Sequence, residues 1–173
     1  VFFFRPPVAA GRLANTLARM ELLGPQVRLE SQCEAVLRSL PMWFGIEEAL
    51  RMYVADTARL PTFALSANGA VVAFLSLMQH FPESWEIHCI AVHAEARNRG
   101  HGTELLNHAE QWLLEQGVAY LQVKTVAHTS KSTEYAETRE FYRARGFTPL
   151  EIFPLLWAPH NPALQLVKVL HAG

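Results

Sequence analysis

The sequence predicts an α/β protein of one domain, in which a mixed, mostly antiparallel central sheet is flanked by helices. Half of the 173 residues are hydrophobic, which is enough for one core and too little chain for two comfortable domains. Runs that alternate with period two, typical of strands, are interleaved with runs of helical period. The order is a strand, two helices, a meander of strands, and then helices alternating with strands. That order suits a sheet with helices on its faces.

The beginning of the chain is the least legible part. We expect residues 1–25 to be an N-terminal extension of uncertain structure and residues 26–173 to be the single domain. Within the extension, three residues are spaced as on one face of a short helix, namely Leu13, Leu17 and Met20. The Gly24-Pro25 pair would end that helix. Alternation over 27–29 then predicts a short strand.

Two helices are expected next, over residues 31–40 and 46–60. Ser31 and Glu34 have the spacing of a capping box at the start of the first helix. In the second helix, apolar residues recur on one face: Ile46, Leu50, Tyr53, Val54 and Ala58. A short loop between the helices therefore has to turn the chain back.

The middle of the chain predicts a meander of strands. Asn68-Gly69 separates runs 62–67 and 71–79 and is the strongest short hairpin signal. A third strand is expected over 85–92. A periodic helix, a strand, a second helix and two last strands follow, over 103–116, 120–126, 134–145, 147–153 and 164–170.

Composition excludes several function classes. Fifteen Lys and Arg against sixteen Asp and Glu give a net charge of −1, so no overall positive field draws the protein to nucleic acid or to an anionic membrane. No apolar run is long enough to span a bilayer. Cys33 and Cys89 have no metal spacing, and the eight histidines contain no HxxxH pair. We therefore expect a cytoplasmic protein without a metal, a nucleic-acid partner or a membrane partner.

The most informative segment joins an apolar strand to the periodic helix. Gly100 and Gly102 remove side chains where the backbone turns into the helix, so consecutive N–H groups can face outward at its positive end. Arg97 and Arg99 add charge suited to phosphate oxygens. The segment predicts a seat for pyrophosphate. Taken alone, the same glycines are also compatible with a turn that only connects two elements.

Two motifs carry a resemblance to a known family. The pattern R-x-x-G-x-G over 97–102 resembles the acetyl-CoA signature, R/Q-x-x-G-x-G/A, of the GNAT superfamily of N-acetyltransferases. The run FYRARGF over 141–147 resembles the late motif of that family, an aromatic-Tyr pair on a helix that ends in Gly-Phe. The order of strands and helices expected over 26–170 also resembles that of the family. The resemblance implies a GNAT-like acyl-CoA N-acyltransferase fold with acetyl-CoA as co-substrate.

The resemblance also implies an activity. The expected enzyme moves an acetyl group from acetyl-CoA to a primary amine by direct attack on the thioester. The acceptor is either a small-molecule amine or a protein amine, and the sequence does not identify it. The oligomeric state stays open, although dimers are common among such proteins. The alternative function is a non-catalytic acyl-CoA-binding or sensing domain on the same fold, because a fold does not fix a function.

The family's cofactor contacts can be placed on this chain by position. Ile90, Ala91 and Val92 would offer main-chain groups to pantetheine, on a strand that the resemblance expects to splay from its neighbour. The pyrophosphate loop would comprise Arg97, Asn98, Arg99, Gly100, His101, Gly102 and Thr103. Tyr135 and Thr138 stand where the family commonly has Asn and Ala. Tyr135 is assigned to the cofactor, but this departure leaves open how the corner is held.

Catalytic and acceptor residues follow from the same resemblance. Tyr142 matches the family's general acid for the departing thiolate, or is a helix aromatic that faces the core. Glu86 and His88 are two apart on one strand and share a face, so either is a candidate base, unless they only hydrogen-bond across the sheet. Trp43 and Phe44 precede the second helix, where the family lines its acceptor pocket. Their alternative role is a hydrophobic plug between helices.

Overall fold

The computed structural model describes residues 19–26, 28–129 and 132–170. In this part of the chain, seven strands form one sheet in the order β1-β2-β3-β4-β5-β7-β6. Within these described residues, β4 and β5 pair in parallel and the other strand pairs are antiparallel. The elements are β1 (Met20–Gln26), α1 (Glu30–Arg38), α2 (Glu47–Asp56), β2 (Thr62–Ala67), β3 (Ala70–Phe81), β4 (Ser84–Val92), the 3₁₀ helix η1 (Ala94–Ala96), α3 (His101–Glu115), β5 (Tyr120–Val126), α4 (Thr133–Arg143), β6 (Thr148–Ala158) and β7 (Asn161–Val169). The predicted fold class is confirmed.

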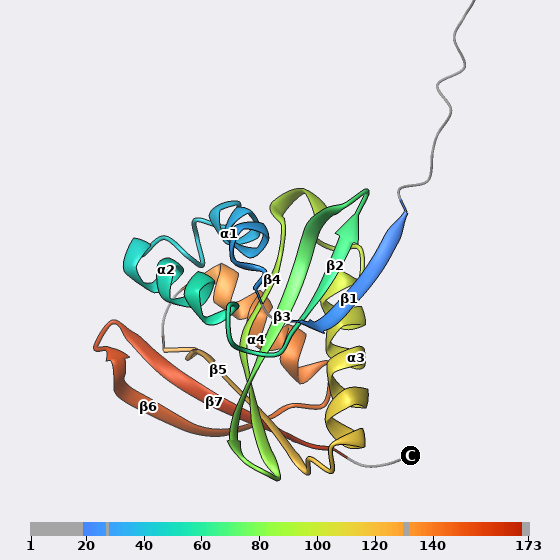
Figure 1. Cartoon of the computed structure of the whole chain (residues 1–173). Coiled ribbons are helices and arrows are strands. Elements are labelled where there is room, and N and C mark those ends of the chain that lie inside the picture. The colour runs from blue at the N-terminus through green and yellow to red at the C-terminus, as the bar shows by residue number, and fades with distance from the viewer. Residues whose placement is uncertain (1–18, 27, 130–131, 171–173) are drawn as a thin grey trace, which may run out of the picture.

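Helices cover both faces of the sheet, and each face has its own hydrophobic cluster (Figure 1). Leu105 and Leu106 of α3 pack with Leu75 of β3 on one face. On the other face, Leu37 of α1 packs with Phe74, the residue that precedes Leu75 in β3. Neighbouring residues of a strand point to opposite faces, so β3 contributes to both clusters.

The chain joins the sheet earlier than the sequence predicts. Met20 lies in β1, which pairs antiparallel with β2, so the expectation of a helix at this residue is wrong. Residues 24–25 fall at an irregularity of that strand rather than at a helix end. The strand expected over 27–29 is also wrong, because Leu29 is the N-cap of α1. Leu13 and Leu17 lie outside the described residues.

The two helices after β1 differ from expectation in their ends. Leu29 precedes α1 without a side-chain cap, and Ser31 lies inside the helix, so the expected capping box does not form. Helix α2 ends at Asp56 rather than near residue 60. The hydroxyl of Thr57 donates to the carbonyl oxygen of Val54 at 2.7 Å and caps this end. Helices that are held by tertiary packing do not need the best local cap.

Strand β4 contains a β-bulge at His88. Ser76 of β3 lies opposite Cys89, and the next residue, Leu77, lies opposite Ile87, so His88 is an extra residue. Ile87 belongs to the cluster under α3, whereas Cys89 belongs to the cluster under α1. Bulges re-aim side chains and often lie near active sites.

Beyond the bulge, β4 and β5 separate. Their parallel pairing runs from Ser84 with Tyr120 to Ile87 with Val123 and does not continue. Strand β4 remains paired to β3 as far as Val92. This is the divergence that the resemblance implied for the strand before the glycine-rich loop. The separation opens a gap between the ends of β4 and β5, and this gap leads to the start of α3.

Candidate active site

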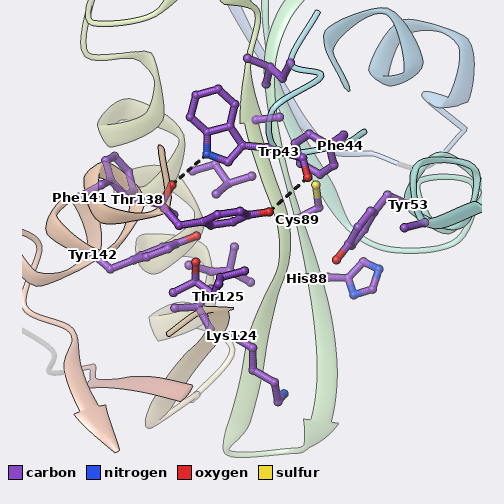
Figure 2. A pocket seen from close by; sticks show the side chains of 18 of the residues that line it. Trp43, Phe44, Tyr53, His88, Cys89, Lys124, Thr125, Thr138, Phe141 and Tyr142 are labelled. Carbon is purple, nitrogen blue, oxygen red and sulfur yellow. Dashed lines mark hydrogen bonds between the residues drawn. The ribbon is translucent and has the colours of Figure 1, made fainter. Parts of the chain in front are cut away.

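A cavity of about 750 Å³ opens where β4 and β5 diverge. Its walls come from these strands, from α2 and α4, from the loop between α1 and α2, and from the β6–β7 hairpin (Figure 2). It brings together many of the residues expected from the sequence: Trp43, Phe44, His88, Ile90, Ala91, Val92, Arg97, Asn98, Gly102, Tyr135 and Tyr142. The others do not line it: Glu86, Arg99, Gly100, His101 and Thr103.

Main-chain groups of β4 point into the gap. The N–H of His93 donates to the carbonyl oxygen of Val72 at 2.8 Å, so the amide of His93 faces β3. Amide directions alternate along a strand of an antiparallel pair. The amides of Val92 and Ile90 therefore point away from β3, toward the side where β5 no longer pairs. A chain with carbonyl groups, laid in the gap, could accept hydrogen bonds from these amides.

The glycine-rich loop ends at the N-terminus of α3. Gly100 is the N-cap with φ 86°, and its carbonyl oxygen accepts the first helical bond, from Glu104, at 3.0 Å. The N–H groups of residues 101–103 precede that bond and are free for an anion. A Cβ on Gly102 would lie 3.2 Å from the ring of Phe141, so this glycine also lets α4 approach.

Two arginines, Arg97 and Arg145, come from the loop before α3 and from just after the end of α4. The Nη2 atom of Arg97 lies 3.1 Å from the carboxylate of Glu137, and its guanidinium lies 4.5 Å from the Trp43 ring centroid. Arg145 donates from Nε to the hydroxyl of Thr103 at 3.0 Å. Arg145 was missed by sequence reasoning, although it lies in the late motif. Positive charge at a helix N-terminus favours an anion at that place.

Trp43 is fastened to α4 by two hydrogen bonds. Its Nε1–H donates to the hydroxyl of Thr138 at 3.2 Å, and its carbonyl oxygen accepts from the hydroxyl of Tyr135 at 3.2 Å (Figure 2). Tyr135 and Thr138 are the two positions that depart from the family pattern. We name Trp43, Tyr135 and Thr138 the tryptophan clamp. The departures thus form one contact between α4 and the loop before α2.

Tyr142 has its ring in the core and its hydroxyl toward the cavity. The residue is 3% exposed, and its ring lies against Phe141 and Phe147 with centroids 5.3 and 5.4 Å away. Figure 2 shows the hydroxyl pointing into the cavity. Burial raises the pKa of Tyr142, so the hydroxyl keeps its proton at neutral pH.

His88 contacts a buried carboxylate that the sequence did not reveal as a site residue. Its Nε2 lies 2.7 Å from Oδ2 of Asp56, which is 7% exposed at the end of α2. Arg59 binds the other oxygen of Asp56 at 2.5 Å. The Tyr53 ring lies 5.3 Å from the His88 ring. Sequence spacing could have indicated Asp56, because it lies three residues after Tyr53 and so shares the same face of the helix.

Glu86 is held by Lys124 and His80 beside the cavity rather than in its wall. Lys124 of β5 donates to its Oε2 at 2.6 Å, and Nε2 of His80 lies 2.7 Å from the same oxygen. The Glu86 side chain is 12% exposed. These contacts match the cross-sheet role that was the alternative for Glu86, while Lys124 itself lines the cavity.

The end of the cavity formed by α2 and the β6–β7 hairpin, on the opposite side of the molecule from α3, is apolar (Figure 1). Phe44 meets Tyr53 edge to face with centroids 5.7 Å apart. Met52 of α2 and Leu156 and Trp157 of the β6–β7 hairpin complete this end. That hairpin is longer than the sequence predicts, since β6 runs to Ala158. We call Phe44, Met52, Tyr53, Leu156 and Trp157 the apolar end.

No group of three His, Cys, Asp or Glu side chains in residues 19–170, gaps excepted, is placed to hold a metal ion. In the same part of the chain, no helix has both the length and the apolar character needed to cross a membrane.

Comparison with known proteins places this site in a family. A model of the acetyltransferase (GNAT) family matches residues 29–147. No curated protein matches the chain. The ribosomal-protein-S18-alanine N-acetyltransferase from Escherichia coli is 19% identical, with TM-score 0.70 over 90% of this chain and 97% of that chain. The aminoglycoside 6'-N-acetyltransferase from Enterococcus faecium is 20% identical, with TM-score 0.66 over 84% of this chain and 92% of that chain.

A third solved structure, an aminoglycoside 6'-N-acetyltransferase complexed with coenzyme A, is 20% identical, with TM-score 0.65 over 84% of this chain and 92% of that chain. At such identities, structural likeness shows the fold alone. The family match covers more than half of the chain and agrees with both sequence motifs. With the split strands and the glycine-rich helix start, it shows that this chain belongs to the GNAT acetyltransferase family.

Proposed function

We propose that the protein is an N-acetyltransferase that moves the acetyl group of acetyl-CoA to a primary amine, by direct attack of the amine on the thioester. One observation carries the proposal. The gap between β4 and β5 joins the free N-terminus of α3 to the hydroxyl of Tyr142, past the unpaired amides of Ile90 and Val92. The solved neighbour with coenzyme A supports a cofactor of this class.

Coenzyme A would lie along this gap. Its pyrophosphate would accept hydrogen bonds from N–H groups in the loop over 97–103, where charge-assisted bonds are the strong ones. Pantetheine would follow the main chain of residues 90–92. The Tyr135 hydroxyl is already bonded to Trp43, so we assign Tyr135 to the wall of the cofactor channel. Arg145 adds charge beside the same helix end.

The acceptor must lose a proton before it can attack, because an alkylammonium has a pKa near 10. His88 is the proposed base that accepts this proton. It lines the cavity and is held by Asp56. Glu86 is the weaker candidate, since Lys124 and His80 hold its carboxylate. Neutral imidazole accepts protons near pH 7.

Attack produces a tetrahedral oxyanion, and the leaving group is the thiolate of coenzyme A. An amide of β4, at Ile90 or beside it, would donate to the oxyanion, where a prepared donor is worth most. Tyr142 would then give its proton to the thiolate sulfur and recover it from solvent. The proposed acid role rests on the position of the hydroxyl at the cavity, because burial keeps the proton on Tyr142 but makes it a weaker acid.

The test removes one oxygen from Tyr142. The Tyr142→Phe variant keeps the ring packed against Phe141 and Phe147, so coenzyme A affinity and the melting temperature should barely move. Turnover should fall by about 10² or more, which is the lower range for general-acid catalysis. Steady-state release of the coenzyme A thiol, calorimetric binding of coenzyme A and thermal melts measure the three quantities.

Tyr120→Phe makes the same change at an exposed residue outside the cavity and is the control. Near-wild-type turnover of Tyr142→Phe would remove Tyr142 from the acid role. Tight coenzyme A binding without transfer to any amine would overturn catalysis and favour the acyl-CoA-binding alternative.

A further inference from the structure

We infer that the acceptor is a small primary amine with a single positive charge and an apolar, preferably aromatic, group. This inference rests on the proposed function, because it concerns the acceptor side of the same cavity. It follows from three properties of the described lining residues: their apolar surface, the placement of their aromatic rings, and their charge.

Apolar side chains are left uncovered at the far end of the cavity. Met52 is 51% exposed, Leu156 50% and Trp157 47%, and all three line the cavity. Water-exposed apolar surface inside a concave site favours a ligand that covers it. These side chains come from α2 and from the β6–β7 hairpin, so the ligand would be held between two separate elements.

Aromatic rings lead from this apolar end to His88. Phe44 packs on Tyr53 at 5.7 Å, and Tyr53 packs on His88 at 5.3 Å. A ring bound among these side chains can make edge-to-face contacts with them. Its aminoalkyl chain would then reach the proposed base, and the amine nitrogen would meet the acetyl group in the gap between β4 and β5.

The charges of the cavity oppose a polycation. Among the described lining residues, Glu137 is the one carboxylate, and Arg97 at the cofactor end binds it. The carboxylates behind the wall also have cationic or histidine partners, since Lys124 and His80 hold Glu86, and Arg59 and His88 hold Asp56. A second or third ammonium group would lose water without gaining a free carboxylate. It would also face Lys124.

The volume of the cavity limits the size of the acceptor. The 750 Å³ also has to hold the acetyl group and part of pantetheine. Small-molecule sites are commonly about 300–1,000 Å³. The remaining space suits a ligand of one ring and a short chain. The solved neighbours that act on aminoglycosides share the fold with this chain, but we do not expect them to share its acceptor.

The first experiment compares amines with the wild-type protein and acetyl-CoA. We expect kcat/KM for 2-phenylethylamine to exceed that for ethylamine by about tenfold or more, the discrimination a hydrophobic pocket gives for added apolar groups. Spermidine and kanamycin should be slower than 2-phenylethylamine by at least as much. A higher kcat/KM for either polycation would overturn the inference.

The second experiment places a carboxylate in the apolar end. Met52→Glu should lower kcat/KM for 2-phenylethylamine by about tenfold and raise it for spermidine, because the added charge pairs with a second ammonium and disfavours the ring. Met42→Glu is the matched control, since Met42 is 63% exposed and does not line the cavity. Thermal melts should be alike for the two variants. Equal kinetics of the two variants would place the acceptor elsewhere and overturn the inference.

The outcomes separate the two proposals. Transfer to kanamycin or spermidine but not to 2-phenylethylamine would overturn the inferred acceptor and leave the acetyltransferase function standing. Coenzyme A binding without transfer to any amine, small or peptide, would overturn both. Calorimetric binding of 2-phenylethylamine to the coenzyme A complex gives a readout besides activity, and we expect Met52→Glu to weaken it.

Discussion

The contact between His88 and Asp56 decides which nitrogen of the imidazole can accept a proton. Neutral imidazole has one donor and one acceptor nitrogen. A carboxylate accepts hydrogen bonds only, so Asp56 selects the tautomer with its proton on Nε2, 2.7 Å away. Nδ1 then carries the free lone pair, and it has no protein partner in the described part of the chain. Asp56 would therefore be a positioning residue that acts through His88.

Asp56→Asn tests this role. The amide can turn its NH₂ toward Nε2 and select the other tautomer, which would block Nδ1 as a base. We expect kcat to fall roughly 10- to 100-fold, with little change in KM for acetyl-CoA. Steady-state kinetics at pH 7 and thermal melts of both proteins measure the effect.

A double-mutant cycle with His88→Gln is the control. If Asp56 acts through His88, adding Asp56→Asn to His88→Gln should lower kcat no further. Additive losses in kcat would show that Asp56 matters for stability or shape rather than for the histidine. The cycle distinguishes these cases even where Asp56→Asn lowers the melting temperature.

Single site residues could be predicted only where their motif is local. The glycine-rich loop and Tyr142 lie in short runs with recognisable spacing, so the sequence located both. Asp56 was missed because its partner His88 is 32 residues away. The tryptophan clamp joins residues 95 positions apart, and no periodicity records such a contact.

Helix α3 begins at the proposed phosphate seat, and Gly102 tests that placement. Gly102→Asp puts a negative charge beside the free N–H groups, so coenzyme A affinity should fall about tenfold or more through lost charge-assisted bonds and repulsion. Its Cβ would also meet the ring of Phe141 at 3.2 Å. Calorimetry with coenzyme A measures the affinity, and thermal melts report the packing strain.

Gly102→Ala is the matched variant, because it adds the Cβ without the charge. The difference in affinity between the Asp and Ala variants isolates the charge at the seat, and it should shrink as salt is raised. If the Asp and Ala variants bind coenzyme A equally, the pyrophosphate does not lie at this helix end.

Elements with a regular pattern were predicted well. The bounds of β2 and β5 agree with expectation at both ends, because alternation and turn residues mark them. Strand β1 was missed because it exists through its pairing with β2, a partner distant in sequence. The bulge at His88 leaves no mark either, since polar and apolar residues keep alternating through it.

The molecule as a whole should lose stability in alkaline solution. Burial raises the pKa of Cys33 from 9.0 to about 12 and that of Tyr53 from 10.0 to about 12. Above pH 9 the unfolded chain releases protons that the native protein keeps, so the free energy of unfolding falls as pH rises toward 12. Below about pH 8 these groups contribute no change. Urea unfolding under reducing conditions at pH 8, 9, 10 and 10.5 measures the trend.

Cys33→Ala isolates one part of this effect. The variant removes the thiol, so its free energy of unfolding should fall less steeply between pH 9 and 10.5 than that of the wild type. Each such group contributes at most about 1.4 kcal/mol per pH unit. The slope is compared rather than the absolute stability, because the lost packing lowers the latter. Identical slopes would mean that Cys33 ionises alike in both states.

The extra residue in β4 shifts the phase of the strand by one position. Before His88, the odd-numbered residues Trp85 and Ile87 face α3, and after it the odd-numbered Cys89 and Ala91 face α1. A relative without the extra residue has the opposite parity beyond this point. Aligning the two without a gap would match core positions of one with cavity positions of the other. Substitution profiles of this strand should therefore be compared separately on each side of residue 88.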